Sequence, residues 1–76
     1  MGRRFSRHGD LTPREREIVS LLATGLTGEQ IATELLVSGE TVRTHIRNAM
    51  QRLDAHTRAH LIAIAVRHGE LQLEDV

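Results

Sequence analysis

The 76-residue sequence contains no cysteine, lysine, tryptophan or tyrosine, and Phe5 is its single aromatic residue. Without cysteine the chain forms neither a disulfide nor a thiolate metal site, which suits a reducing compartment. The longest apolar run, residues 61–66, is far shorter than the ~18 residues that a membrane-spanning helix needs. Because no apolar signal region follows the arginine-rich start, we expect a soluble cytoplasmic protein with no membrane partner.

The sequence also lacks the patterns that mark common enzymes. It has no Ser-His-acid signature, no glycine-rich phosphate loop and no pair of acids placed for a plausible cleft. His56 and His60 have the four-residue spacing that can hold zinc on a helix, but no third ligand accompanies them. We therefore predict a small single domain that is not an enzyme and that holds no metal and no cofactor.

Charge is balanced overall but distributed unevenly along the chain. Ten arginines match ten acids, so the formal net charge of zero gives no indication of a nucleic-acid partner. Residues 10–40 carry two arginines and six acids, whereas residues 41–60 carry four arginines and one aspartate. The sequence therefore predicts a strong dipole whose basic part is the segment 41–60.

Four residues that commonly begin helices divide the chain into four short helices. The predicted N-caps are Thr12, Thr27, Ser38 and Thr57. The first two form capping boxes with Glu15 and Gln30. The predicted helices cover about 13–24, closed by Gly25, then about two turns after residue 27, then about 39–53, and about 58–68, closed by Gly69.

This spacing predicts an all-α fold, a four-helix bundle that contains a helix-turn-helix. The second and third helices are separated by only a few residues, and the longer third helix is the more basic. Any small helical bundle shows a similar outline, so periodicity alone leaves a protein-interaction bundle open.

The predicted third helix has an apolar stripe and a polar remainder. At about 100° per residue, the stripe expected to face the core consists of Val42, Ile46, Ala49, Met50 and Leu53. One side of the remaining arc holds Arg43, Thr44 and Arg47, together with Glu40 and Gln51. Each guanidinium fork can grip the O6 and N7 atoms of guanine, and Thr44 can meet thymine. The other side offers hydrogen-bond donors for phosphates from Thr41, His45, Asn48 and Arg52. An ordinary solvated face is the alternative, although acids are scarce along it.

These residues resemble the LuxR-type (GerE-like) DNA-binding domain of bacterial transcription regulators. The resemblance is carried by the motifs LTPRERE at 11–17, GLT at 25–27, QIA at 30–32 and ETVRTHI at 40–46, and by Asn48, Arg52, Leu53, Thr57, Arg58 and Gly69. It spans about residues 11–71. It implies a tetrahelical effector domain whose third helix enters the major groove of double-stranded DNA and whose fourth helix mediates homodimerisation. It also implies a receiver or ligand-sensing domain that precedes this one, as in a response regulator.

The resemblance implies a set of contact residues in this sequence. The base-reading positions are Arg43, Thr44 and Arg47, and the backbone-contacting positions are Thr27, Gln30, Ser38, Thr41, His45, Asn48, Arg52 and Arg58. Two positions depart from the family pattern. Glu29 stands where the family often has a basic residue, and it would face a phosphate unfavourably. Asp54 stands where a glycine is common, although aspartate tolerates the left-handed conformation.

The predicted fourth helix is apolar on nearly all sides. His60 and Arg67 share an angle and are taken to mark the outward direction, which places Leu61, Ile62, Ala65 and Val66 toward the core. We therefore predict a homodimer seam of His60, Ala63, Ile64 and Arg67. The alternative is that these apolar residues are exposed on a monomer and need no partner.

The predicted organisation has three parts. Residues 1–10 are expected to be a linker or flexible N-terminal arm, residues 11–71 the helix-turn-helix domain and residues 72–76 an acidic C-terminal tail. A sigma-factor region-four-like promoter-recognition domain is the rival within DNA binding, but it normally lacks the apolar fourth helix.

Overall fold

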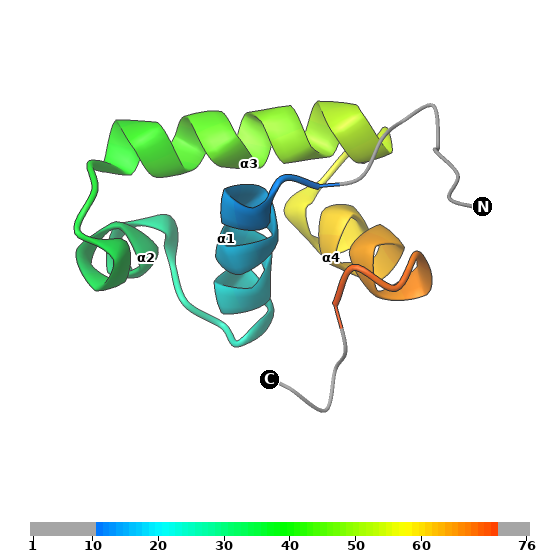
Figure 1. Cartoon of the computed structure of the whole chain (residues 1–76), viewed down its shortest axis with the longest axis horizontal. Helices are drawn as coiled ribbons and strands as arrows, with labels where there is room; N and C mark the ends of the chain where they lie inside the picture. The colour runs from blue at the N-terminus through cyan, green and yellow to red at the C-terminus, as the bar shows by residue number, and fades with distance from the viewer. Residues whose placement is uncertain (1–10, 72–76) are drawn as a thin grey trace.

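The computed structural model describes residues 11–71, which fold into four helices without a strand (Figure 1). The helices are α1 (Pro13–Ala23), α2 (Gly28–Leu35), α3 (Gly39–Leu53) and α4 (Arg58–Arg67). All four predicted starts are confirmed, while α1 and α4 each end one residue before the predicted end. The expectations for residues 1–10 and 72–76 concern segments outside the described residues.

Each helix begins at the predicted capping residue. The Thr12 hydroxyl accepts the Glu15 N–H at 3.1 Å, and the Glu15 carboxylate accepts the Thr12 N–H at 3.0 Å. Thr27 and Gln30 make the same reciprocal pair at the start of α2. Because the first N–H groups of a helix have no partner within it, these contacts fix where each helix begins.

The core lies where α1 and α3 meet the other helices. Each of these two helices contacts all three others, and α2 and α4 lie on opposite sides of α1 (Figure 1). The predicted stripe of α3 is confirmed at Val42, Ile46, Ala49 and Leu53, which are buried. Met50, also predicted in the stripe, is only partly buried against the core. Burial of one stripe leaves the opposite face of α3 exposed.

The orientation predicted for α4 is confirmed at Leu61 and Ala65, which are buried, but it is wrong at Ile64. Ile64, expected in the dimer seam, is only 8% exposed and belongs to the core, together with Leu61 and Ala65. Ile62 and Val66, also expected in the core, are partly buried and pack against it. His60, Ala63 and Arg67 are exposed, as the sequence predicts. Ala59, four residues before Ala63, is exposed beside them.

Two helices end at non-glycine residues in the left-handed conformation. Asp54 has φ 57° at the end of α3, as the sequence predicts. Leu36 has φ 60° at the end of α2, and this leucine is 90% exposed. A leucine gains no packing energy at such an exposed position, and its Cβ is strained there. The turn between α2 and α3 is therefore held by its neighbours rather than favoured by Leu36.

Replacing Leu36 by glycine is expected to stabilise the domain by about 0.5–1 kcal/mol, because glycine adopts positive φ without strain and no buried contact is lost. Urea denaturation followed by circular dichroism measures this change. Leu36→Ala is the matched control, and it should leave the free energy of unfolding nearly unchanged because alanine retains the Cβ. Equal stability of the glycine and alanine variants would contradict the assignment of strain.

Candidate nucleic-acid interface

Two arginines project from the exposed face of α3. Arg43 has a side chain that is 60% exposed and lies 3.5 Å from the exposed carboxylate of Glu40, an i, i+3 surface pair of little energetic weight. Arg47 is exposed and has no carboxylate partner within residues 11–71. Both guanidinium groups are therefore available to an approaching anion or base edge.

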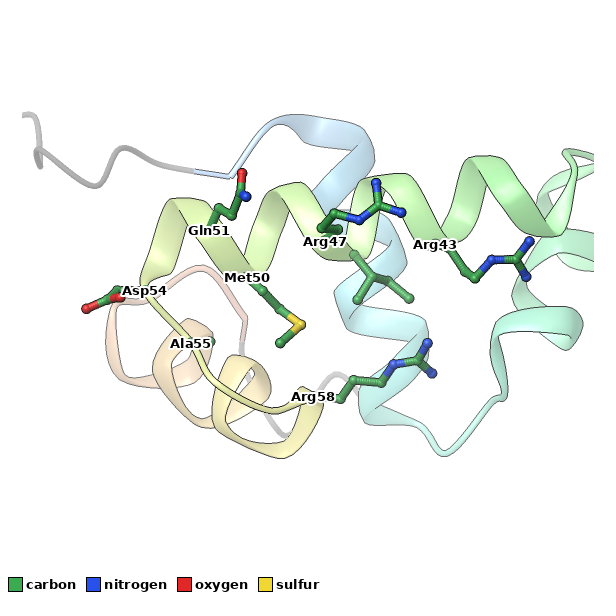
Figure 2. A pocket seen from close by; sticks show the side chains of 8 residues that line it. Arg43, Arg47, Met50, Gln51, Asp54, Ala55 and Arg58 are labelled. Carbon is green, nitrogen blue, oxygen red and sulfur yellow. The ribbon is translucent and has the colours of Figure 1, made fainter.

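Arg58, the first residue of α4, lies on the same face as these two arginines (Figure 2). An open groove of about 490 Å³ is lined by Arg43, Ile46, Arg47, Met50, Gln51, Asp54, Ala55 and Arg58. We call this the arginine groove. A second recess, lined by Thr27, Gly28, Glu29, Gly39, Arg43 and Arg58, continues it to the start of α2. Residues far apart in sequence thus meet on one basic surface.

The remaining predicted contact residues surround this surface. Thr44, Thr41 and His45 are partly exposed along α3, and Asn48 is exposed. Gln51 was absent from the predicted contacts although it lines the arginine groove. Its helical angle, which is about 40° from that of Arg47 and on the same side of the helix, was the signal that could have identified it.

Three other predicted contacts have their oxygen atoms occupied by capping. Thr27 and Ser38 each accept a backbone N–H at a helix start, and the side-chain oxygen of Gln30 accepts the N–H of Thr27. The Ser38 hydroxyl also donates to the Thr41 hydroxyl at 2.9 Å. Capping leaves the Thr27 O–H and the Gln30 amide N–H groups free, because it uses only their acceptor atoms. Thr27 and Gln30 therefore offer donors to phosphate oxygen atoms, whereas the exposed carboxylate of Glu29 beside them repels a phosphate.

Arg52, which the sequence predicts as a phosphate contact, is instead bonded to another residue of the domain. Its Nε and Nη2 atoms donate to the two carboxylate oxygens of Glu15 at 3.0 and 3.2 Å. The Glu15 side chain is 3% exposed and that of Arg52 is 37% exposed. This bidentate pair joins the start of α1 to the last turn of α3, so Arg52 has a structural role.

The environment of Glu15 favours its ionised form. Burial alone would raise the pKa of this carboxyl, but hydrogen bonds from Arg52 and from the Thr12 N–H outweigh burial. The positive charges of Arg52 and His45 act in the same direction, and together they hold the pKa of Glu15 below its ordinary value. A single carboxylate thus caps α1 and holds α3 in place.

The two histidines near the start of α4 make a local contact. The His56 N–H donates to Nδ1 of His60 at 3.1 Å, and their rings stack with centroids 5.6 Å apart. Within residues 11–71, no three side chains of the types that ligate metals come together. The four-residue spacing places Nδ1 of His60 on the His56 N–H, just before the first residue of α4.

The chain is similar to known bacterial proteins in both sequence and structure. The family model described as "Bacterial regulatory proteins, luxR family" matches residues 10–65. The chain is 48% identical over 63 residues to the spore germination protein GerE of Bacillus subtilis, covering 83% of this chain and 85% of that protein. A solved structure titled as that of the transcription factor GerE has a TM-score of 0.80 and 43% identity, covering 83% of this chain and 94% of that one.

A longer relative is the response regulatory protein YgeK of Escherichia coli, described as uncharacterized. It is 46% identical over 66 residues, which cover 87% of this chain but only 45% of that protein. The chain therefore spans less than half of this relative. In the described part of the chain, no helix is both long and apolar enough to cross a membrane.

Proposed function

Because this chain belongs to the luxR family of bacterial regulatory proteins and is a LuxR-type DNA-binding domain, we propose that α3 reads base edges in the major groove. In this proposal Arg43 and Arg47 each grip a guanine, and Thr44 contacts a neighbouring base edge. The observation that carries the proposal is the exposure of both guanidinium groups on the solvent side of α3, beside its buried stripe. Arg47 has no carboxylate partner within residues 11–71, and Arg43 has only the weak surface pair with Glu40.

The phosphate contacts in this proposal flank the base-reading residues. They comprise Thr27, Gln30, Thr41, His45, Asn48 and Arg58. Arg52 is left out because it pairs with Glu15, and Ser38 because its hydroxyl proton is already donated to Thr41. Arg58 is supported by its place beside Arg43 in both recesses, which brings the start of α4 to the same duplex. These contacts would position the domain, whereas α3 would provide the sequence specificity.

Selection of bound fragments from a pool of random duplexes tests this proposal, because it reports sequence preference and half-site symmetry together. We expect an enriched motif that contains guanines. Binding of the selected duplex should fall steeply between about 50 mM and about 200 mM salt, since arginines release counterions from phosphates. Failure to enrich any motif, with equal binding of all duplexes, would contradict base reading by α3.

We also propose that the domain binds DNA as a homodimer through α4. The exposed part of this helix is apolar and has small residues at Ala59 and Ala63, which permit close approach of a symmetry-related helix. Ile62 and Val66 add partly exposed apolar surface, and His60 and Arg67 border it. Burial of Ile64 removes it from this seam. A sensory or receiver domain preceding residue 11 is part of the same proposal, as the longer relatives suggest.

Ala63→Glu is expected to abolish cooperative occupancy of two half-sites while leaving binding to a single half-site unchanged. The substituted position is exposed, so the helix should remain folded, but two carboxylates would face each other across the seam. Footprinting over a protein titration measures cooperativity. The matched control is Thr33→Glu on the exposed part of α2. Unchanged cooperativity in the Ala63→Glu variant would contradict this seam.

A further inference from the structure

Thr44 and Gln51 lie on the side of α3 that points most directly away from the core. At about 100° per residue, the two side chains are about 20° apart and about two turns distant, and the middle of the buried stripe is on the opposite side of the helix. Gln51 is exposed, and in Figure 2 it projects from the same side of α3 as Arg47, whereas Met50 points toward α4. The centre of the exposed face is therefore shared by a proposed base-reading residue and a glutamine.

The side-chain amide of Gln51 makes no hydrogen bond to another residue among residues 11–71. The next residue, Arg52, is by contrast held by the Glu15 carboxylate. An amide presents N–H donors and an oxygen acceptor side by side, and it has no charge. Gln51 is therefore suited to a ligand that offers an adjacent donor and acceptor, and it gains little from the charge of a phosphate.

The proposed phosphate contacts lie on both sides of this central line of α3. Thr41 and His45 are on one side of it. Arg58, from the start of α4, is on the other side, where it lines the arginine groove together with Arg43. Phosphates on both sides would place the long axis of α3 along the major groove, which is wide enough to admit a helix. Side chains on the central line would then face base edges over two turns, as recognition helices of other DNA-binding folds do.

We propose that Gln51 is a specificity-determining residue that reads an adenine in the major groove. This inference rests on the proposed function, because it requires the exposed face of α3 to lie against base edges. The Gln51 amide matches adenine, since its oxygen can accept from the N6 amino group while its N–H donates to N7. Gln51 follows Arg47 by four residues, or ~6 Å along the helix, so the adenine lies about one or two base pairs from the guanine that Arg47 reads.

The contribution of Gln51 differs in kind from that of the arginines. An arginine attracts the phosphates of every duplex as well as a guanine, whereas a neutral amide contributes only where the matching base is present. Gln51→Ala should therefore weaken binding to the selected duplex by about 5- to 150-fold and leave the affinity for a random-sequence duplex unchanged. The whole effect falls on the ratio of specific to non-specific affinity.

Selection of bound fragments from random duplexes, repeated with wild type, Gln51→Ala and Gln51→Glu, tests the proposal. We expect the wild-type motif to contain an adenine about one or two base pairs from a guanine in each half-site. Gln51→Ala should lose the preference at this position alone. Gln51→Glu should replace the adenine by cytosine, because a carboxylate accepts from the cytosine N4 amino group. Alanine and glutamate are good helix formers, so both variants should fold.

Thr33→Ala and Thr33→Glu are the matched controls, because Thr33 is exposed on α2 and lies outside the arginine groove. Both should select the wild-type motif. The proposal is overturned if the wild-type motif has no adenine at this position, or if either variant of Gln51 retains the adenine preference. The alanine variant is decisive if the glutamate variant binds no duplex. Failure of wild type to enrich any motif would instead contradict the proposed function itself.

Discussion

Replacing Arg47 by alanine is expected to weaken binding to the selected duplex by about 5- to 150-fold, with a much smaller loss on random DNA. Arg47 is exposed on the outer face of α3, and it has no carboxylate partner in the described part of the chain. Its guanidinium fork is therefore free to form two hydrogen bonds with guanine, and alanine would leave both acceptor atoms unpaired. Titration of both duplexes under the same salt conditions measures the difference.

Two further variants determine the cause of that loss. Arg47→Lys retains the charge but not the planar fork, so it should lose most of the specificity and little of the affinity for random DNA. Arg67→Ala, in the last turn of α4, removes an exposed arginine from outside the arginine groove and should affect single half-site binding little. Equal losses of Arg47→Ala on both duplexes would identify this residue as a phosphate contact.

Replacing Glu15 by alanine is expected to lower the free energy of unfolding by about 2–3 kcal/mol. The substitution removes the buried acceptor of two Arg52 hydrogen bonds and the acceptor of the Thr12 N–H. The partial exposure of Arg52 keeps the loss below that of a fully buried pair, because the guanidinium can regain water. A domain of this length has a total free energy of unfolding of about 4–11 kcal/mol. The loss is therefore a large fraction of the total, and urea denaturation measures it.

The same pair predicts a dependence on pH. The pKa of Glu15 is lower in the folded state than in the unfolded state, so the unfolded state binds its proton first as pH falls. The stabilisation is therefore complete above the unfolded pKa of about 4.3 and is lost at lower pH. Glu15→Gln preserves an acceptor for the Thr12 N–H but cannot ionise. The stability difference between wild type and Glu15→Gln should shrink below about pH 4.3.

Glu17→Gln is the control for this experiment, because Glu17 lies on the same helix with a half-exposed side chain and makes only a surface pair with Arg14. It should change stability little at any pH. A stability difference between wild type and Glu15→Gln that stays constant through the acidic range would show that the charge of Glu15 does not contribute.

The helix boundaries and the recognition face could be predicted because both depend on residues that are close together in the sequence. A capping residue acts on an N–H group three positions away, and the buried stripe of α3 follows from the helical period alone. Thr12, Thr27, Ser38 and Thr57 therefore identified every helix start. The apolar stripe that begins with Val42 and Ile46 was sufficient to orient α3, since the residues on the rest of the helix are polar.

The features that could not be predicted depend on contacts between distant segments. Arg52 has the side-chain type and the helical position that are expected of a phosphate contact. Only the packing of α1 across α3 brings the Glu15 carboxylate within hydrogen-bond distance of it. The buried face of α4 could not be fully predicted either, because a helix that is apolar on nearly all sides has no unique face to bury. Ile64 and Val66 are equally apolar, and the shape of the core alone decides that Ile64 is buried.

Methylation interference on the selected duplex tests most directly whether the arginine face of α3 lies in the major groove. Methylation of guanine N7 blocks an acceptor that only the major groove exposes, whereas methylation of adenine N3 marks the minor groove. We predict that N7 methylation at particular guanines prevents binding and that Arg47→Ala removes this sensitivity at one guanine per half-site. Interference at adenine N3 without any interference at guanine N7 would contradict the placement of α3 in the major groove.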